Sequence, residues 1–415
     1  MTWINYIILA AIISIWAMLL VNVILIVAGY VYYYKSEHYK FPKMSAYPMV
    51  SVLVPAHNEE KVIARTLESL LQFNYPADSY EIIVINDNSD DNSAKILNGI
   101  KQNYPNRMVT IINTDNISGG KGKSNALNIG LQYCRGRFVV IYDADNTPEK
   151  DALRYLVAEI STNEKLGAVI GKFRTRNRNA NWLTRFINIE TIAFQWMAQA
   201  GRWQLFNLCT IPGTNFIIRK SILDSIGGWD IHALAEDTEI SFQIYRKGYM
   251  IKFLPQAVTW EQEPQTLKVW FQQRTRWVKG NIYVIIKNIP LLKNTASGKV
   301  RFDIYYMLTT YFLLLTSLII SDMLFIGNAL GWIHSTLAGF SMILWSMAII
   351  LFIIGTFVTI TPEKGEMTTT NFFYVFIMYF TYSKLWTIVA AYGLVEYLKD
   401  TLFKRESQWY KTERF

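Results

Sequence analysis

The chain has 415 residues, of which 51% are hydrophobic and only 18% are charged, and its formal net charge is +9. An ordinary soluble domain has about 25% charged residues, so this composition indicates long apolar segments. The positive charge comes without a Lys/Arg tract or a recognisable nucleic-acid-binding motif, and we therefore expect no nucleic-acid partner. The two cysteines, Cys134 and Cys209, form no Cys-x-x-Cys pair, which argues against a zinc site or a disulfide framework.

The first long apolar run covers residues 6–34 and contains no charged residue. It is long enough to cross a bilayer, and we predict a transmembrane helix there. A signal peptide is the alternative, but no basic residue precedes the run and no clear cleavage site follows it. Lys35, Lys40 and Lys43 follow the run directly, which places the N-terminus outside and the next domain in the cytoplasm.

Residues 48–265 alternate short apolar runs with amphipathic stretches, a pattern typical of an α/β domain. We expect buried strands at residues 50–55, 81–85, 109–112, 138–142 and 168–170. We expect helices between them at residues 59–71, 93–102, 123–134 and 149–160. Strands that alternate with helices predict a mostly parallel sheet covered on both faces. Ligands in such sheets bind beyond the carboxyl ends of the strands.

Two further segments, residues 182–205 and 267–289, are rich in Trp, Phe and Ile but are interrupted by charged residues. This composition favours amphipathic helices that lie in the membrane interface. The second segment falls within an interface region that we assign to residues 266–302. Ordinary core helices of the α/β domain are the alternative.

Residues 303–398 are again apolar. They contain three runs that are each long enough to span a membrane: 304–333, 337–360 and 372–398. The tail, residues 399–415, is basic, which favours the cytoplasmic side. One N-terminal helix and three full spans would instead leave the tail outside. A run that is broken or re-entrant near Lys384 would remove this conflict, and the sequence leaves both arrangements open.

Acidic residues follow two of the predicted strands. Asp143 and Asp145 come directly after the fourth predicted strand, at its carboxyl end. Two carboxylates at this spacing can hold a divalent cation whose other ligands are water and phosphate oxygens. Asp87 follows the second predicted strand and can hydrogen-bond a base or a ribose. A turn and a helix start are the alternative for residues 88–92.

Residues 119–124 contain two lysines among glycines but lack the spacing of a P-loop. We expect a flexible loop that brings Lys121 or Lys123 to a phosphate, with a solvated loop as the alternative. Glu236 and Asp237 precede a predicted helix, and a carboxylate there can accept a proton from an attacking hydroxyl. The alternative is a helix-start carboxylate stabilised by the helix dipole.

The block from Gln273 to Trp277 reads Gln-Arg-Thr-Arg-Trp. Arg276 can bind a diphosphate through two parallel hydrogen bonds, and Trp277 offers a flat apolar face to a sugar ring. The alternative is an interfacial helix whose arginines extend to the polar headgroups and whose tryptophan anchors it.

Taken together, these motifs and their order resemble the processive membrane family-2 glycosyltransferases, such as cellulose, hyaluronan and poly-N-acetylglucosamine synthases. The resemblance extends from residue 50 to residue 277, more than half of the chain. The matching positions are residues 54–59, Asp87, residues 122–128, Asp143 with Asp145, Glu236 with Asp237, and Gln273 with Arg276 and Trp277. The resemblance implies a nucleotide-sugar transferase domain of the glycosyltransferase A type, inserted between transmembrane helices.

The resemblance also implies a role for each position. Asp87 would contact the uracil of a UDP-sugar, and Asp143 and Asp145 would bind Mg²⁺ or Mn²⁺ and the diphosphate. Asp237, beside Glu236, would be the general base. The remaining positions would hold the donor diphosphate and the acceptor end of the polymer: Gln273, Arg276, Trp277, Gly213, Thr214 and Asn215.

These roles predict a multi-pass enzyme of the cell membrane with a cytoplasmic catalytic domain. It would polymerise a β-linked polysaccharide from a UDP-sugar by a single inverting displacement and translocate the product. Residues 211–216 look more like those of glucan synthases, which favours UDP-glucose. The alternatives are a poly-N-acetylglucosamine synthase that uses UDP-N-acetylglucosamine, a non-processive transferase that glycosylates a lipid, and a non-enzymatic membrane subunit. The partners would be the UDP-sugar, the growing polysaccharide, the bilayer, and accessory export or regulatory subunits.

Overall fold

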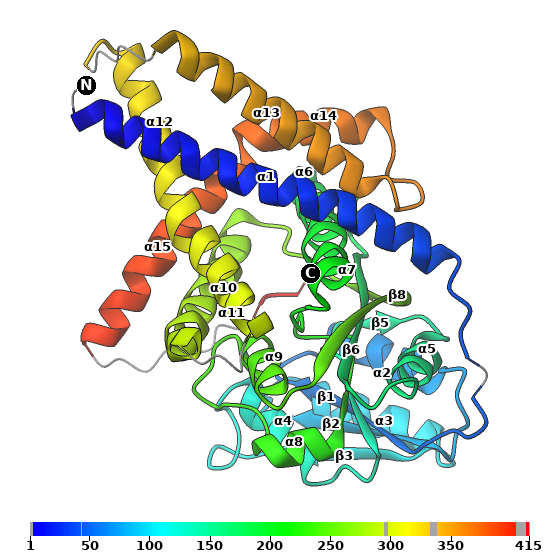
Figure 1. The fold of residues 1–415 in the computed structure, drawn as a ribbon. Helices are drawn as coiled ribbons and strands as arrows, with labels where there is room; N and C mark the ends of the chain where they lie inside the picture. Colours follow the sequence, from blue (N-terminus) through cyan, green and yellow to red (C-terminus); the bar gives the residue numbers. More distant parts are fainter. Residues whose placement is uncertain (1–2, 43, 294–297, 333–337, 404–411, 415) are drawn as a thin grey trace.

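The computed structural model describes residues 3–42, 44–293, 298–332, 338–403 and 412–414. Two parts of the molecule lie against each other (Figure 1). One part is an α/β domain, and the other is a group of long apolar helices that covers one side of it. Both ends of the chain contribute to the apolar group, through α1 (Trp3–Glu37) and α15 (Tyr382–Leu402).

Within the described residues, the α/β domain contains one eight-stranded sheet with the order β3-β2-β1-β4-β7-β6-β8-β5. The first four strands in this order are parallel, whereas β7 runs antiparallel to both of its neighbours. β8 is parallel to β6, and β5 is antiparallel to β8. The strands are β1 (Val50–Ala56), β2 (Tyr80–Asn86), β3 (Val109–Asn113), β4 (Phe138–Ile141), β5 (Thr147–Pro148), β6 (Leu166–Thr175), β7 (Phe216–Arg219) and β8 (Met250–Glu261).

The predicted α/β class is confirmed, and the strands from β3 to β4 pair in the expected parallel manner. The other half of the sheet is mixed, because β7 enters between β4 and β6 against their direction. The helices of the domain are α2 (Ile63–Leu71), α3 (Ser93–Asn103), α4 (Lys123–Leu131), α5 (Ala152–Ile160), α8 (Lys220–Ile226) and α9 (Glu236–Arg246).

The helix expected at residues 59–71 begins four residues later, at Ile63. The preceding residues form a turn whose amide groups bond to side chains of the segment after β2. The N–H of Glu59 donates to Ser93 Oγ at 2.9 Å, and the N–H of Glu60 donates to Asp91 Oδ2 at 2.9 Å. These local hydrogen bonds satisfy the amide groups that a longer helix would have used.

The sheet has a hydrophobic core on each face, because side chains alternate along a strand. Val52 and Val54 belong to a core with residues of α2 and α5. Leu53, between them, faces the opposite core, which also contains Phe186 and Val389. This second core continues from the sheet into the apolar helices, so the two parts of the molecule share buried apolar surface.

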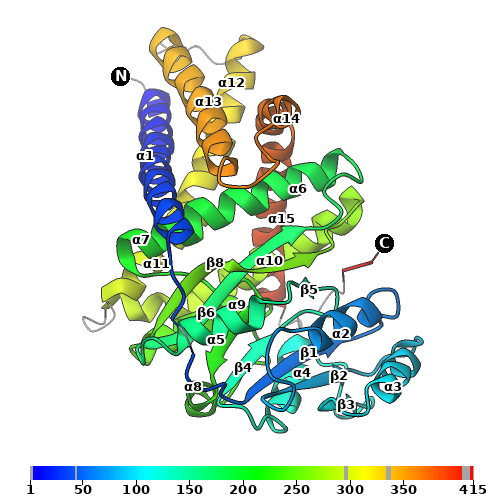
Figure 2. The same ribbon diagram turned by 90° about the vertical axis from the view of Figure 1, so that its right-hand side faces the viewer.

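A helical segment lies between the sheet and the apolar helices (Figure 2). It consists of α6 (Trp182–Ala193), the π-helix η1 (Phe194–Gly201) and α7 (Arg202–Phe206). Gly29 of α1 and Gly201 let the backbones approach closely, because a Cβ at Gly29 would overlap the carbonyl oxygen of Trp196. The segment predicted at residues 182–205 is therefore a helix with most side chains buried between the two parts.

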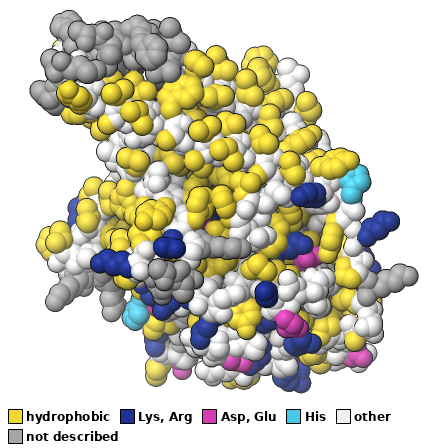
Figure 3. All heavy atoms as spheres, viewed as in Figure 1, with side chains coloured by type: hydrophobic (Ala, Val, Ile, Leu, Met, Phe, Trp, Pro, Cys, Tyr) yellow, Lys and Arg dark blue, Asp and Glu magenta, His cyan; other side chains and the backbone are white. Residues whose placement is uncertain are grey.

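The remaining helices continue from the sheet into the apolar group. They are α10 (Leu267–Asn288), η2 (Ile289–Lys293), α11 (Gly298–Leu308), η4 (Thr309–Leu314), α12 (Leu315–Ala329), α13 (Ala338–Ile360) and α14 (Thr369–Phe380). Hydrophobic side chains cover most of the apolar group, while basic side chains gather below it (Figure 3).

Two helices among the described residues are long and apolar enough to cross a membrane, Asn5–Glu37 and Val300–Met323. A third span results if α14 and α15, which meet at an angle of 40°, are counted as one. Their break at Thr381 lies three residues before Lys384, close to the break considered from the sequence. Residues 333–337, at the start of the expected run 337–360, lie outside the described residues.

We predict that Gly29→Val lowers the stability of the protein by about 1–3 kcal/mol, the usual cost of overpacking a tight contact. The added side chain would force α1 away from the backbone of Trp196. The measurement is the thermal unfolding midpoint of the purified protein in detergent. Gly99→Val in α3 is the matched control, since nothing lies within 4 Å of a Cβ there. An equal fall of the unfolding midpoint in both variants would contradict the close contact between Gly29 and the backbone of Trp196.

Candidate active site

The predicted site residues come from elements that end at one edge of the sheet. Asp87 follows β2 and Asp143 follows β4, whereas Lys123 is the first residue of α4. Glu236 is the first residue of α9. Because β1, β2 and β4 are parallel, their carboxyl ends meet at this edge, and the chain returns to it in α9 and α10.

Asp87 is a buried carboxylate held in a fixed orientation. Its Oδ1 accepts a hydrogen bond from Thr114 Oγ1 at 2.8 Å and from the N–H of Gly120 at 3.0 Å. Gly119 is required here, because a Cβ at this residue would overlap both Thr114 Oγ1 and Asp87 Oδ1. The loop after β3 therefore closes onto Asp87, a contact that no local pattern in the sequence indicates.

Lys123 is the centre of an ionic cluster. Its Nζ lies 2.6 Å from Asp143 Oδ1 and 3.3 Å from Glu236 Oε1. It also donates to the carbonyl oxygen of Gly213 at 2.8 Å. Burial alone would lower the pKa of Lys123, but the neighbouring Asp143 and Glu236 raise it above its ordinary value. Lys123 thus binds carboxylates of the site, a role that its position in a glycine-rich loop did not indicate.

Asp237 belongs to the same cluster. A Cβ at Gly213, whose φ is +89°, would lie 3.1 Å from Asp237 Oδ2. Burial and the adjacent Glu236 raise the pKa of Asp237 to about 7, against the opposing effects of Lys123 and Arg276. A carboxyl group with this pKa exchanges a proton readily near neutral pH, which suits general-base chemistry.

Asp145 lies in a second group of acids. Its Oδ2 accepts from the N–H of Gln262 at 3.3 Å and lies 2.8 Å from a guanidinium nitrogen of Arg414. Burial and the charges of its neighbours raise the pKa of Glu263 to about 7 and that of Glu261 well above its ordinary value. Glu261 is the last residue of β8 and Glu263 lies two residues beyond it, and no motif in the sequence indicated either of them.

The acidic groups fit a divalent cation in their chemistry, because carboxylate oxygens are the ligands that Mg²⁺ and Mn²⁺ prefer. Burial and then the charges of neighbouring acids raise the carboxyl pKa values of Asp237, Glu261 and Glu263, and a nearby cation would oppose these effects. Among the described residues, no group of three or more His, Cys, Asp and Glu side chains is arranged to hold a metal. Asp143 and Asp145 can therefore supply only part of a coordination shell, with water and phosphate oxygens as the remainder.

Thr214 and Asn215 differ in their surroundings although they are adjacent. The hydroxyl of Thr214 accepts from the N–H of Asp143 at 3.1 Å, so it supports the segment that carries Asp143 and Asp145. The side-chain amide of Asn215 is fully buried and donates to the carbonyl oxygens of Lys172 and Ala257, both at 2.9 Å. The structure therefore places Asn215 within the sheet, apart from the other predicted substrate-binding residues.

The Gln-Arg-Thr-Arg-Trp block lies on α10. Arg276 lies near the acids of α9 and β4, and burial lowers its pKa in spite of the opposing charges of Glu236 and Asp143. Trp277 is 38% exposed. A depression of about 510 Å³ opens beside Arg276 between α10 and α15, and its lining residues are Leu234, Lys268, Phe271, Gln272, Thr275, Arg276, Lys279, Tyr392 and Glu396.

Arg274, the first arginine of the block, fills a structural role that the sequence did not reveal. It is fully buried, donates to Gln273 Oε1 at 2.9 Å, and stacks 3.8 Å from the centre of the Trp277 ring. Its guanidinium also lies 3.6 Å from Glu190 and 4.0 Å from Glu263. The only sequence signal was the spacing of three between Arg274 and Trp277, which puts both on one face of a helix.

The same network extends to the break between the apolar helices. Tyr382, at the start of α15, donates its hydroxyl to Glu190 of α6. Trp270 of α10 donates its Nε1–H to the Tyr382 hydroxyl at 2.9 Å. The apolar helices are therefore connected by hydrogen bonds to the helix that carries Gln273, Arg276 and Trp277.

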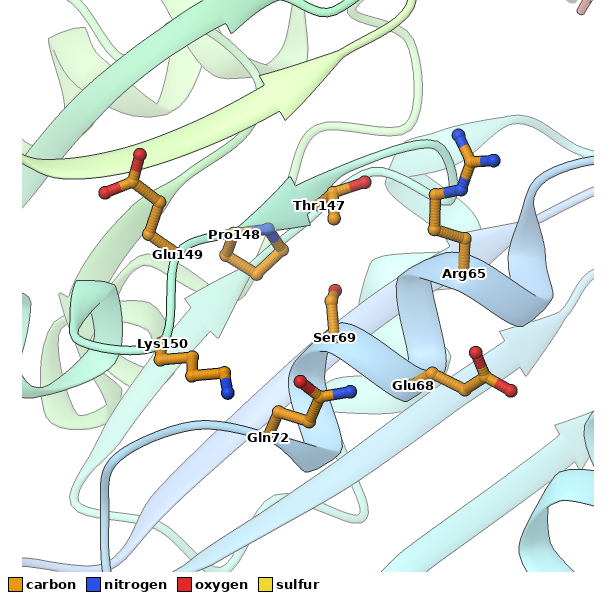
Figure 4. A pocket seen from close by; sticks show the side chains of 8 residues that line it. All are labelled: Arg65, Glu68, Ser69, Gln72, Thr147, Pro148, Glu149 and Lys150. Atoms are coloured by element: carbon orange, nitrogen blue, oxygen red, sulfur yellow. The ribbon is translucent and has the colours of Figure 1, made fainter.

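A separate depression of about 380 Å³ lies between α2 and the residues around β5 (Figure 4). Figure 4 shows side chains of α2, including Arg65 and Glu68, opposite those of Glu149 and Lys150. The predicted site residues do not line it, and we assign it no role in the reaction.

Comparison with known proteins identifies the family. Residues 48–280 match the family described as glycosyltransferase like family 2. The chain is 48% identical over 405 residues, 97% of its length and 96% of the relative's, to "Probable glycosyltransferase YdaM" of Bacillus subtilis (strain 168). It is 32% identical over 260 residues to "Poly-beta-1,6-N-acetyl-D-glucosamine synthase" of Staphylococcus epidermidis (strain RP62A), covering 62% of this chain and 60% of that protein.

A solved structure is also similar: "Mannosyltransferase PcManGT from Pyrobaculum calidifontis in complex with GDP-Man and Mn2+". It matches with a TM-score of 0.64 at 20% sequence identity, over 95% of this chain and 99% of that chain. At this identity the likeness supports the fold, a glycosyltransferase A domain with a mixed sheet.

The fold and the family match are those of a nucleotide-sugar transferase. The family match covers more than half of the chain, so the chain belongs to glycosyltransferase family 2.

We predict that Arg274→Gln destabilises the protein by about 3 kcal/mol, because it leaves the buried carboxylate of Glu263 without its cation. The free energy of unfolding, measured by denaturant titration in detergent, tests this. Arg154→Gln is the control, since its pair with Asp151 is exposed on both sides and contributes less than about 1 kcal/mol. A loss at Arg274 no larger than that at Arg154 would refute the structural role.

Proposed function

We propose that this protein is a processive, inverting synthase that builds a β-linked polysaccharide from a UDP-sugar at the cell membrane. One observation carries the proposal: Arg276 of α10 lies near the acids of the Lys123 cluster and also lines a depression whose far wall belongs to the apolar helix α15. A catalytic site next to a membrane segment suits an enzyme whose product leaves along that segment.

The donor would bind with its base near Asp87 and its diphosphate near Asp143 and Asp145. A Mg²⁺ or Mn²⁺ ion held there would neutralise the charge of the departing diphosphate. The mannosyltransferase of similar fold was solved with Mn²⁺ and GDP-mannose, which supports a divalent ion. Arg276 supplies a further positive charge on the same side of the site, and its fork can bind two phosphate oxygens.

Asp237 would act as the general base. It accepts the proton of the acceptor hydroxyl while the new bond forms to the anomeric carbon and the bond to the diphosphate breaks. The attack occurs opposite to the leaving group, so an α-linked donor gives a β-linked product. Lys123 and the N–H of Thr238, which donates to Asp237 Oδ1 at 2.7 Å, hold the carboxylates in place.

The acceptor would enter beside Gly213, Thr214, Gln273 and Trp277. Trp277 is exposed enough to stack on a sugar ring. Tyr392 and Glu396 of α15 line the depression beside Arg276, which precedes Trp277 in α10, and this supports an acceptor path next to the candidate membrane segment. We propose a multi-pass topology with the α/β domain in the cytoplasm, as Lys35 in the last turn of α1 and Lys40 after it favour.

The identity of the donor's sugar is the most specific part of the proposal. The glucose preference drawn from residues 211–216 rests on sequence alone. The relatives at 29–32% identity whose names give a polymer are poly-β-1,6-N-acetyl-D-glucosamine synthases of staphylococci. We therefore propose UDP-N-acetylglucosamine as the first donor to test and UDP-glucose as the second.

The direct test incubates the full-length protein in liposomes with Mn²⁺ and one donor at a time: UDP-N-acetylglucosamine, UDP-glucose or GDP-mannose. We expect release of UDP and a ladder of products that linkage-specific hydrolases degrade. Asp237→Asn should reduce the rate by about 10²–10⁴-fold, the usual contribution of a general base. A single added sugar on a lipid would instead establish the non-processive alternative. If no donor led to nucleotide release, both polysaccharide synthases and the lipid-glycosylating transferase would be excluded.

We also predict the pH dependence. Asp237 must be ionised to accept a proton, and its pKa is raised to about 7. At low donor concentration, kcat/KM should rise about tenfold per pH unit below pH 7 and level off above it. Removing the adjacent charge in Glu236→Gln should lower the pKa of Asp237 and move the midpoint to lower pH. A midpoint that stays near 7 in this variant would assign the titration to another group.

A further inference from the structure

The described C-terminal residues lie in the candidate active site, away from the end of α15 (Figure 1). A guanidinium nitrogen of Arg414 lies 2.8 Å from Asp145 Oδ2, and its Nε lies 3.3 Å from Glu59 Oε2. Lys61 Nζ donates to the carbonyl oxygen of Arg414 at 3.0 Å. Three contacts from two elements therefore hold Arg414, whose side chain is only 16% exposed.

This contact concerns the carboxylate that the donor's metal ion would need. Asp143 is neutralised by Lys123 at 2.6 Å, whereas Asp145 is neutralised by Arg414. A divalent ion on Asp145 and a guanidinium on the same oxygen would repel each other, so the two cations compete. A guanidinium is also the side chain best matched to two phosphate oxygens, and a diphosphate would arrive at this place together with the metal.

We propose that Arg414 is an exchangeable cation of the donor site: it neutralises Asp145 before the substrate binds and pairs with the donor diphosphate once a metal ion takes its place. The inference rests on the proposed donor site but not on the identity of the sugar. It assigns to the end of the chain a substrate-positioning role that a basic tail in the sequence did not indicate.

The competition predicts opposite effects of one substitution on two ligands. Arg414→Gln removes the competing charge, so Mn²⁺ alone should bind more tightly than to the wild type. The same change removes a partner of the phosphates, so inorganic diphosphate in saturating Mn²⁺ should bind more weakly. Each shift should be about tenfold, the scale of one charge-assisted hydrogen bond. A merely structural role would weaken both ligands together.

The experiment uses the full-length protein in detergent. Free Mn²⁺ is measured by electron paramagnetic resonance, and diphosphate binding is measured by calorimetry. Glu413→Gln is the matched control, because Glu413 is the exposed neighbour of Arg414 and should change neither affinity. Arg414→Lys keeps the charge but not the planar fork, so it should leave Mn²⁺ binding near the wild-type value and still weaken diphosphate binding.

Mn²⁺ binding that Arg414→Gln leaves unchanged or weakens would overturn the proposal, as would unchanged diphosphate binding. Absence of Mn²⁺ binding in both proteins would overturn it too. Neither measurement requires sugar transfer. If Arg414→Gln shifts the Mn²⁺ and diphosphate affinities in opposite directions but the protein makes no polymer, the role of Arg414 stands and only the proposed synthase activity is refuted.

Discussion

The buried ammonium of Lys123 is the interaction on which the site depends. It bridges Asp143, at the end of β4, and Glu236, at the start of α9, and it also holds the carbonyl oxygen of Gly213. Without this cation, like charges would gather in a region of low dielectric, where repulsion is strong. The ammonium therefore lets three separate parts of the chain meet, and it still leaves Asp237 with a pKa close to neutrality.

The apolar helices take part in forming this site. A Cβ at Gly393 of α15 would lie 2.7 Å from Val278 of α10, so the two helices are packed in direct contact. Tyr382 adds hydrogen bonds to α6 and α10 at the break between α14 and α15. The helix that carries Arg276 and Trp277 is thus packed on a candidate membrane segment, so this packing helps to orient the site.

The sequence predicted what short local patterns encode. Continuous apolar runs revealed the buried strands β1 to β4, and the acids after them were found because such strands end at the ligand side. β7 has only four residues, a run too short to indicate a strand, and Lys252, Pro255 and Gln256 interrupt the apolar pattern of β8. Asn215 shared a motif with Thr214, yet its amide supports the sheet. Pairs between distant residues have no local pattern, since they depend on the completed fold.

The charges around Asp143 and Asp145 explain why the ion pairs of Lys123 and Arg414, which the sequence did not indicate, matter for the site. Without ligands, Asp143 is neutralised by Lys123 of α4, and Asp145 is neutralised by Arg414, which follows α15 in the chain. A diphosphate with one divalent ion brings nearly equal positive and negative charge. It can enter such a site at low electrostatic cost only if the displaced guanidinium finds the phosphate oxygens. On the proposal for Arg414, donor binding is an exchange of partners in which the buried carboxylate of Asp145 always keeps a cation.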